Sequence, residues 1–170
     1  EVDIRRSAED ELKASEQKYS QLVEQGNDGI IVIQEGLLVF ANSKMQEMSG
    51  YSKLDYTGKY FIDFVTPEYR GMLTEQYNRR MAGERTSNRY EAEIVTRNKR
   101  VIPVEVNATI IEYDGKPADM AIIRDISERK RAEDTIRSAA EEWRMTFDSI
   151  TDMVSIIDKD HRLMRVNNSF

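Results

Sequence analysis

The sequence of 170 residues contains no cysteine and only one histidine. Without cysteine the chain has no disulfides, no thiolate metal site, no cysteine nucleophile and no cofactor attached through sulfur. The single histidine, His161, lies in the polar segment "DKDHRL". We expect His161 to be a solvated turn residue rather than a phosphoacceptor or a metal ligand.

Long apolar runs are also missing. The apolar run at residues 29–33 is far shorter than the roughly 18 residues that a membrane-spanning helix requires. The first residues are charged, which does not fit a secretory signal. Together with the absence of cysteine, this predicts a cytoplasmic protein without membrane contact.

Charged residues make up 33% of the chain, the net charge is −6, and both signs are mixed throughout. This pattern predicts no basic surface for nucleic acid, and no glycine-rich phosphate loop is present. Carboxylates on the predicted strands alternate with apolar residues, and we expect them to face solvent. They are Glu91, Glu93, Glu105 and Asp119. We therefore expect no enzyme activity from these residues.

Two charged stretches predict helices at the ends of the chain. Residues 1–25 contain neither proline nor an internal glycine, and their apolar residues are spaced four and three apart, as in a coiled coil. Residues 128–149 repeat this spacing. The side chains predicted to form a dimer seam are Leu12, Tyr19, Leu22, Ile136 and Trp143.

Between these helices the pattern predicts an α+β domain of about 100 residues. Residues 29–33 and 37–41 form a hairpin whose turn needs Gly36. Asn42 then caps a short helix, and Thr66 opens a longer helix that ends at Gly83. Three alternating strands follow, which completes a five-stranded antiparallel sheet.

The chain contains an internal repeat. Residues 8–10, "AED", recur 124 positions later as residues 132–134, and residues 30–33 match residues 154–157 at the same shift. A period of this length indicates tandem domains rather than a solenoid. We expect the chain to be a piece of a longer protein, with one complete domain and the beginning of a second.

Several segments resemble a PAS domain of the S-box type. They are "GIIVI", "GLLVFAN", "MSGYS", "GKYF", "DFVTPEYR" and "RDISERKRAED". The resemblance implies a linker helix at 1–25, a PAS domain at 26–127 and a signalling helix at 128–149. It also implies the beginning of a second, truncated PAS domain at 150–170.

The resemblance implies a sensory module of a histidine kinase, which would relay its state through Asp125-Ile126-Ser127 to the following helix. We expect Ser127 to cap that helix and Asp125 to accept a hydrogen bond from Ser127 or to pair with an arginine. The implied partners are a second copy, adjacent PAS and kinase domains and a response regulator. Alternatives are a ligand-free dimerisation spacer, or the input of a cyclic-dinucleotide enzyme or a transcription regulator.

The resemblance also limits the cofactors. A covalent cysteinyl-flavin or a cinnamoyl chromophore needs cysteine, and haem needs a histidine on the long helix, which residues 66–83 lack. A non-covalent small molecule, such as a flavin, a metabolite or a fatty acid, is compatible with the sequence, as is an empty domain. The expected pocket lies between the sheet and the helices. Its candidate residues are Asn42, Met45, Met48, Phe61, Phe64, Leu73, Tyr77, Met81 and Asn107.

Overall fold

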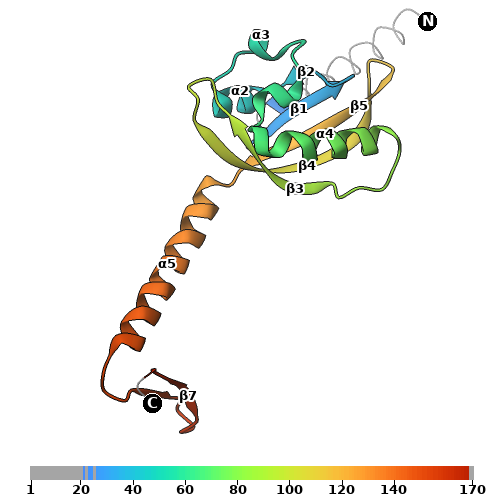
Figure 1. Ribbon diagram of the computed structural model, residues 1–170. Coiled ribbons are helices and arrows are strands. Elements are labelled where there is room, and N and C mark those ends of the chain that lie inside the picture. Colours follow the sequence, from blue (N-terminus) through green and yellow to red (C-terminus); the bar gives the residue numbers. More distant parts are fainter. Residues whose placement is uncertain (1–20, 22, 25, 169–170) are drawn as a thin grey trace, which may run out of the picture. The chain divides into compact units, whose positions relative to one another are not determined.

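The computed structural model describes residues 21, 23, 24 and 26–168 (Figure 1). The chain divides into two compact units, one up to Ser127 and one from Glu128. Residues 1–20 and 22 fall outside the described part. The predicted seam residues Leu12, Tyr19 and Leu22 lie among them.

The first unit contains the predicted five-stranded antiparallel sheet, with the strand order β2-β1-β5-β4-β3. Its strands are β1 (Gly29–Gln34), β2 (Leu37–Ala41), β3 (Arg89–Val95), β4 (Val101–Tyr113) and β5 (Lys116–Asp125). Strand β5 lies in the centre and pairs with both β1 and β4, although it is the last of these five strands along the chain. The last strand of the domain is thus the central strand of the sheet, with two strands on each side.

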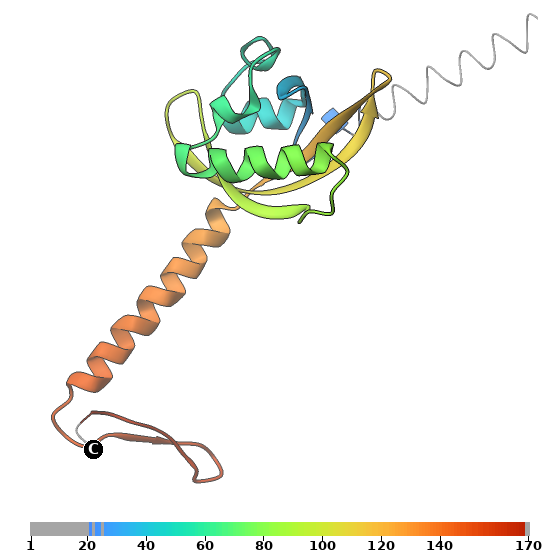
Figure 2. The same cartoon turned by 45° about the vertical axis from the view of Figure 1, so that its right-hand side comes forward.

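Helices cover one face of the sheet, as Figures 1 and 2 show from two directions. They are α2 (Ser43–Ser49), α3 (Lys53–Tyr56), the 3-10 helix η1 (Phe61–Phe64) and α4 (Pro67–Met81). Asn42 caps α2 as predicted, because its side chain accepts a hydrogen bond from the backbone N–H of Met45. Gly50 ends α2 with φ of 75°, a left-handed conformation that glycine adopts without strain.

The hairpin between β1 and β2 turns at Glu35 and Gly36, with φ of 52° and 78°. Two consecutive positive φ values give a turn whose twist matches that of the flanking strands. The turn at Asp114 and Gly115, between β4 and β5, has the same character, with φ of 49° and 72°. Local sequence therefore fixes the register of both hairpins.

The core lies between the helices and the sheet. Alternate residues of each strand point into it, because successive side chains of a strand face opposite sides. The buried cluster includes Ile31, Ile33, Leu38, Ala92, Ile94, Val104, Val106, Ala121 and Ile123 from the strands, and Met45, Tyr56, Leu73 and Tyr77 from the helices.

The second unit contains most of helix α5 (Ser127–Ser149) and a hairpin of β6 (Ser155–Ile157) and β7 (Leu163–Val166). His161 lies in the turn of this hairpin, as predicted, with φ of 61°. On α5 the rings of Trp143 and Phe147 stack with their centroids 5.1 Å apart. The guanidinium of Arg165 lies 4.6 Å from the centroid of the Trp143 ring.

The two hairpins share a hydrogen-bonding pattern. The Asn42 side chain accepts from the N–H of Ile30 and donates to the carbonyl oxygen of Asp28. In the second unit Asn167 accepts from the N–H of Val154 and donates to the carbonyl oxygen of Asp152. The internal repeat therefore corresponds to a repeated local structure.

No helix among the described residues is long and apolar enough to cross a membrane.

Candidate functional site

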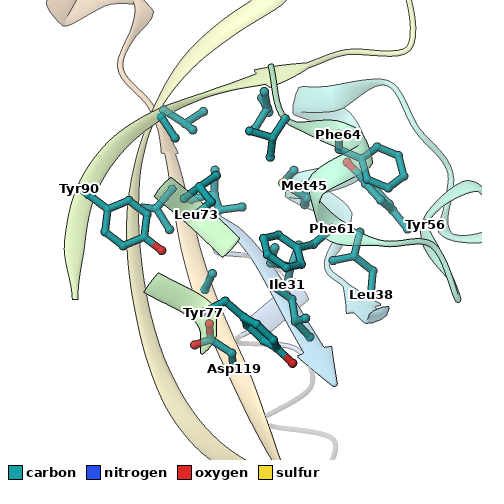
Figure 3. Close-up of a pocket in the computed structure, with 18 of the residues that line it drawn as sticks. Ile31, Leu38, Met45, Tyr56, Phe61, Phe64, Leu73, Tyr77, Tyr90 and Asp119 are labelled. Carbon is teal, nitrogen blue, oxygen red and sulfur yellow. The ribbon is translucent and has the colours of Figure 1, made fainter. Parts of the chain in front are cut away.

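A cavity of about 60 Å³ lies inside the first unit, between the helices and the sheet (Figure 3). Most of the side chains around it are apolar or aromatic. From the helical side they are Met45, Tyr56, Phe61, Phe64, Val65, Leu73, Tyr77 and Arg80. From the sheet they are Ile31, Ile33, Leu38, Tyr90, Ala92, Ile94, Val104, Val106, Asp119, Ala121 and Ile123. All five strands contribute, so the cavity is built by the tertiary fold and not by any one motif.

The structure places five of the nine predicted pocket residues on the cavity wall. They are Met45, Phe61, Phe64, Leu73 and Tyr77. Met48 and Met81 are partly buried and pack against the same core, but they do not line the cavity. The other two candidates, both asparagines, lie elsewhere.

Asn42 is fully buried, yet all its hydrogen bonds are made to the backbone. Its Oδ1 accepts from the N–H groups of Ile30 and Met45, both at 2.9 Å, and its Nδ2 donates to the carbonyl oxygens of Val23 and Asp28. Asn107 is exposed on β4, because Val106 and Ala108 point into the core and Asn107 faces the other way. Neither asparagine is therefore a polar contact for a molecule in the cavity.

Asp119 was expected to face solvent, and this expectation is wrong. Its side chain is 1% exposed and pairs with Arg80, whose side chain is 5% exposed. The Arg80 Nη2 lies 2.7 Å from Asp119 Oδ2, and Nε lies 3.2 Å from both carboxylate oxygens. The reason is register: Asp119 has the same parity on β5 as Ala121 and Ile123, which are core residues. The other three carboxylates alternate with core residues, as expected.

The ion pair makes one end of the cavity polar. The Tyr90 hydroxyl lies beside the pair and accepts a hydrogen bond from Arg80 Nη2 at 3.1 Å. Figure 3 shows Tyr90 and Asp119 on one side of the cavity and the rings of Phe64 and Tyr56 on the other. Burial raises the pKa of the Asp119 carboxyl, and the hydrogen bonds and positive charge of Arg80 oppose that rise.

At the apolar end, Tyr56 is 2% exposed and its hydroxyl donates to Ser49 Oγ. Burial raises the pKa of Tyr56 to about 12, and the hydrogen bond from Tyr56 to Ser49 partly opposes the rise. A tyrosine in an unfolded chain titrates near pH 10. The unfolded chain therefore loses this proton at a lower pH than the folded chain does.

Below about pH 10, Tyr56 is protonated in both the folded and the unfolded chain, and its contribution to the free energy of unfolding is complete. As the pH rises toward 12, we expect the free energy of unfolding to fall by about 2–3 kcal/mol. Urea unfolding at a series of pH values measures this loss. Tyr56→Phe is the control, since it removes the titrating group and should flatten that part of the profile. Equal profiles for the two proteins would contradict the expectation.

The predicted relay motif lies where β5 ends. Asp125 Oδ1 accepts a hydrogen bond from the backbone N–H of Ser127 at 2.7 Å, one of the two roles expected of it. The backbone N–H of Ile126 donates to the carbonyl oxygen of Pro103 on β4, and the Ile126 side chain is buried. Helix α5 begins at Ser127 itself, one residue earlier than predicted, because the Asp125 carboxylate already holds the Ser127 N–H.

A second contact fixes the same end of β5. Arg124 donates from Nη2 to Asp28 Oδ2 at 2.7 Å and from Nε to Asp28 Oδ1 at 3.0 Å. This pair lowers the pKa of Asp28, with the hydrogen bond from Arg124 as the main cause. The segment before β1 is thus tied to the last residues of β5. Sequence reasoning did not single out Arg124, because a partner 96 residues away leaves no local signal.

The family model for the PAS fold matches residues 17–126, more than half of the chain. The chain belongs to the PAS family. A PAS domain is a sensory, non-catalytic module, and the predicted resemblance and fold are confirmed.

Among the described residues, no cluster of three or more histidine, aspartate or glutamate side chains is placed to hold a metal ion.

The PAS domain has relatives among sensor proteins. The chain is 31% identical over 128 residues to the methyl sulfide methyltransferase-associated sensor of Methanosarcina acetivorans, covering 74% of this chain and 13% of that protein. It is 25% identical over 146 residues to sporulation kinase A of Bacillus subtilis, covering 82% of this chain and 23% of that protein. The chain thus spans less than a quarter of each relative.

Solved structures show the same fold. The PAS domain of an HTR-like protein from Haloarcula marismortui superposes with a TM-score of 0.61 at 22% identity, covering 71% of this chain and 99% of that one. A domain of a sensory box sensor histidine kinase/response regulator from Geobacter sulfurreducens gives 0.57 at 25% identity, covering 67% and 96%.

Proposed function

We propose that this chain is the sensory PAS module of a two-component signalling protein and that its cavity reports to helix α5 through strand β5. The observation that carries the proposal is the continuity of one strand. Strand β5 supplies Asp119, Ala121 and Ile123 to the cavity wall and ends at Asp125. Only Ile126 separates its end from the first residue of α5. A molecule that shifts β5 therefore acts directly on the start of the helix.

The proposed output is a histidine kinase in the same protein, which would pass phosphate to a response regulator. Support comes from sporulation kinase A and from PAS domains of sensor histidine kinases among the similar proteins. We also propose that the protein acts in the cytoplasm, because a chain without cysteine suits a reducing compartment. The similarity of the second hairpin to the first supports a second PAS domain that begins near residue 150.

The same proposal includes a homodimer with paired helices. On α5 the predicted seam residue Ile136 is 71% exposed and Trp143 is 47% exposed. Apolar side chains at coiled-coil spacing are suited to packing against a second copy of the helix. This observation also favours a second candidate function, a ligand-free spacer that only sets the geometry of a dimer. Mass spectrometry of small molecules released on denaturation distinguishes the sensor from the spacer. A stoichiometric ligand is expected if the domain is a sensor and not if it is a spacer.

Replacing Asp125 by alanine is expected to loosen the start of α5. The change removes the acceptor for the Ser127 N–H, and loss of such a contact at a helix start costs about 0.5–2 kcal/mol. The first turn of a helix has no intrahelical acceptors for its N–H groups, so the readout is the first amides that donate within α5. Their hydrogen exchange should accelerate roughly 2- to 30-fold.

Asp125→Asn is the matched control, because it keeps an acceptor oxygen at the same position and should exchange at nearly the original rate. In the full-length protein, Asp125→Ala should also weaken the response of the output to the stimulus. Normal regulation in a protein whose first helix-protected amides of α5 exchange faster would contradict the proposed relay.

A further inference from the structure

The polar end of the cavity has hydrogen-bond donors without acceptors. Arg80 uses Nε and Nη2 to bind Asp119 and Tyr90, and its third nitrogen, Nη1, is buried and has no partner among the residues that the structure describes. In the same described part, the Tyr90 hydroxyl accepts a hydrogen bond but has no acceptor for its own proton. Buried donors normally have partners. Both donors are therefore available to an acceptor that enters the cavity.

The charges at this end are already balanced. Arg80 and Asp119 are the only charged residues among the described side chains of the cavity wall, and they pair with each other. An anionic ligand would place two negative charges beside one positive charge in a site of low dielectric, which is unfavourable. A neutral oxygen can accept from Arg80 Nη1 without disturbing that balance. The charges thus favour a neutral acceptor over a carboxylate.

The size of the cavity limits the rest of the molecule. A single water needs roughly 10–15 Å³, so a cavity of about 60 Å³ holds the equivalent of several waters. The remaining wall is formed by aliphatic and aromatic side chains such as Ile31, Phe61 and Leu73. A compact apolar body fits this wall, whereas a fused three-ring flavin exceeds the volume in this conformation.

We propose that the cavity binds a small, neutral, largely apolar molecule with one carbonyl-type oxygen, which accepts hydrogen bonds from Arg80 and Tyr90. The proposal rests on the sensory function proposed above and names its ligand class. It also gives the signal a starting point, because Arg80 belongs to α4 and its partner Asp119 belongs to β5. A ligand that binds the Arg80 guanidinium acts on the contact between that helix and the relay strand.

Three planar probes with four non-hydrogen atoms each match this volume and test the class: acetone, 2-methylpropene and acetate. The full 170-residue chain is labelled with ¹³C at its methionine methyl groups. Met45 lines the cavity and reports binding, and Met164 in the other unit reports non-specific effects. The ketone should shift the Met45 signal saturably and bind about tenfold or more tightly than the alkene, because one hydrogen bond to a charged donor distinguishes them. The carboxylate should bind more weakly than the ketone.

Variants locate the effect. Arg80→Met combined with Asp119→Leu should abolish the preference for the ketone, and Tyr90→Phe, which leaves the ion pair in place, should weaken ketone binding several-fold. Arg79→Met is the matched control, since Arg79 is exposed and pairs with Glu84, and it should bind as the original chain does. Equal binding of ketone and alkene, tighter binding of the carboxylate, or no saturable Met45 shift with any probe would overturn the ligand class. The relay itself is judged separately, by the Asp125 variants.

Discussion

Arg80→Met is expected to lower the free energy of unfolding by about 3–5 kcal/mol. The substitution leaves the Asp119 carboxylate buried in an apolar cavity without its partner, and breaking a buried ion pair on one side carries a cost of this size. Chemical denaturation followed by circular dichroism measures the loss. Arg79→Met, at the preceding position of α4, removes only a solvent-exposed ion pair and should cost less than about 1 kcal/mol.

The loss in the free energy of unfolding caused by Arg80→Met should increase as the pH rises. In the variant, burial still raises the pKa of Asp119, and the charge and hydrogen bonds of Arg80 no longer oppose the rise. The protonated carboxyl is then the form that the fold accommodates. Stability is therefore best retained below about pH 4, the ordinary pKa of aspartate, and is lost as the pH rises through the higher pKa of the folded state.

The double variant Arg80→Met, Asp119→Leu should recover most of the lost stability, because replacing a whole buried ion pair by apolar residues is often neutral or stabilising. Recovery would separate the cost of an unpaired charge from a general loss of packing. A single variant as stable as Arg79→Met at neutral pH would contradict the buried pair.

Asn42→Ala is expected to cost about 3–4 kcal/mol. The side chain caps α2 and also joins β1 to the segment before it, through four hydrogen bonds to backbone groups. Loss of an asparagine cap costs about 0.5–2 kcal/mol, and the three other backbone groups, whose hydrogen bonds are partly buried, add roughly 0.5–1 kcal/mol each. The same unfolding measurement, at pH 7, checks this value.

Asn167→Ala is the matched control for Asn42→Ala. Asn167 makes the corresponding bonds to Val154 and Asp152, but it belongs to the second unit. Its replacement should leave the unfolding transition of the PAS domain within about 0.5 kcal/mol of the original. A large effect of Asn167→Ala, or a small effect of Asn42→Ala, would contradict the assignment of this stability to the Asn42 contacts.

Local patterns were sufficient for the five strands and the main helices. The cap at Asn42 and the hairpin turn at Gly36 were both predicted, because each depends on residues within a few positions of one another. Five of the pocket residues were predicted for a related reason. Apolar residues on the inner face of helices and strands surround whatever space the fold leaves there.

Predictions for polar residues depended on distant partners and were less successful. Asn107 was proposed for the pocket, although Val106 and Ala108 on either side of it are core residues and already exclude it. Asp119 was assigned to the surface because it is charged, although its parity on β5 matches Ala121 and Ile123. Strict use of strand parity would have corrected both. It would not have identified Arg80 as the partner, which lies 39 residues away on a helix.

By itself, the sequence determined the family, the order of the strands and main helices along the chain, the turn at Gly36, the internal repeat and the absence of cysteine chemistry. These features depend on short-range backbone preferences and on side-chain periodicity, which act within a few residues. Only the tertiary structure decided the polar end of the cavity. In the low dielectric of a packed interior, the charge of Asp119 is stable only when it is paired with Arg80. That environment exists only once α4 has packed against β5.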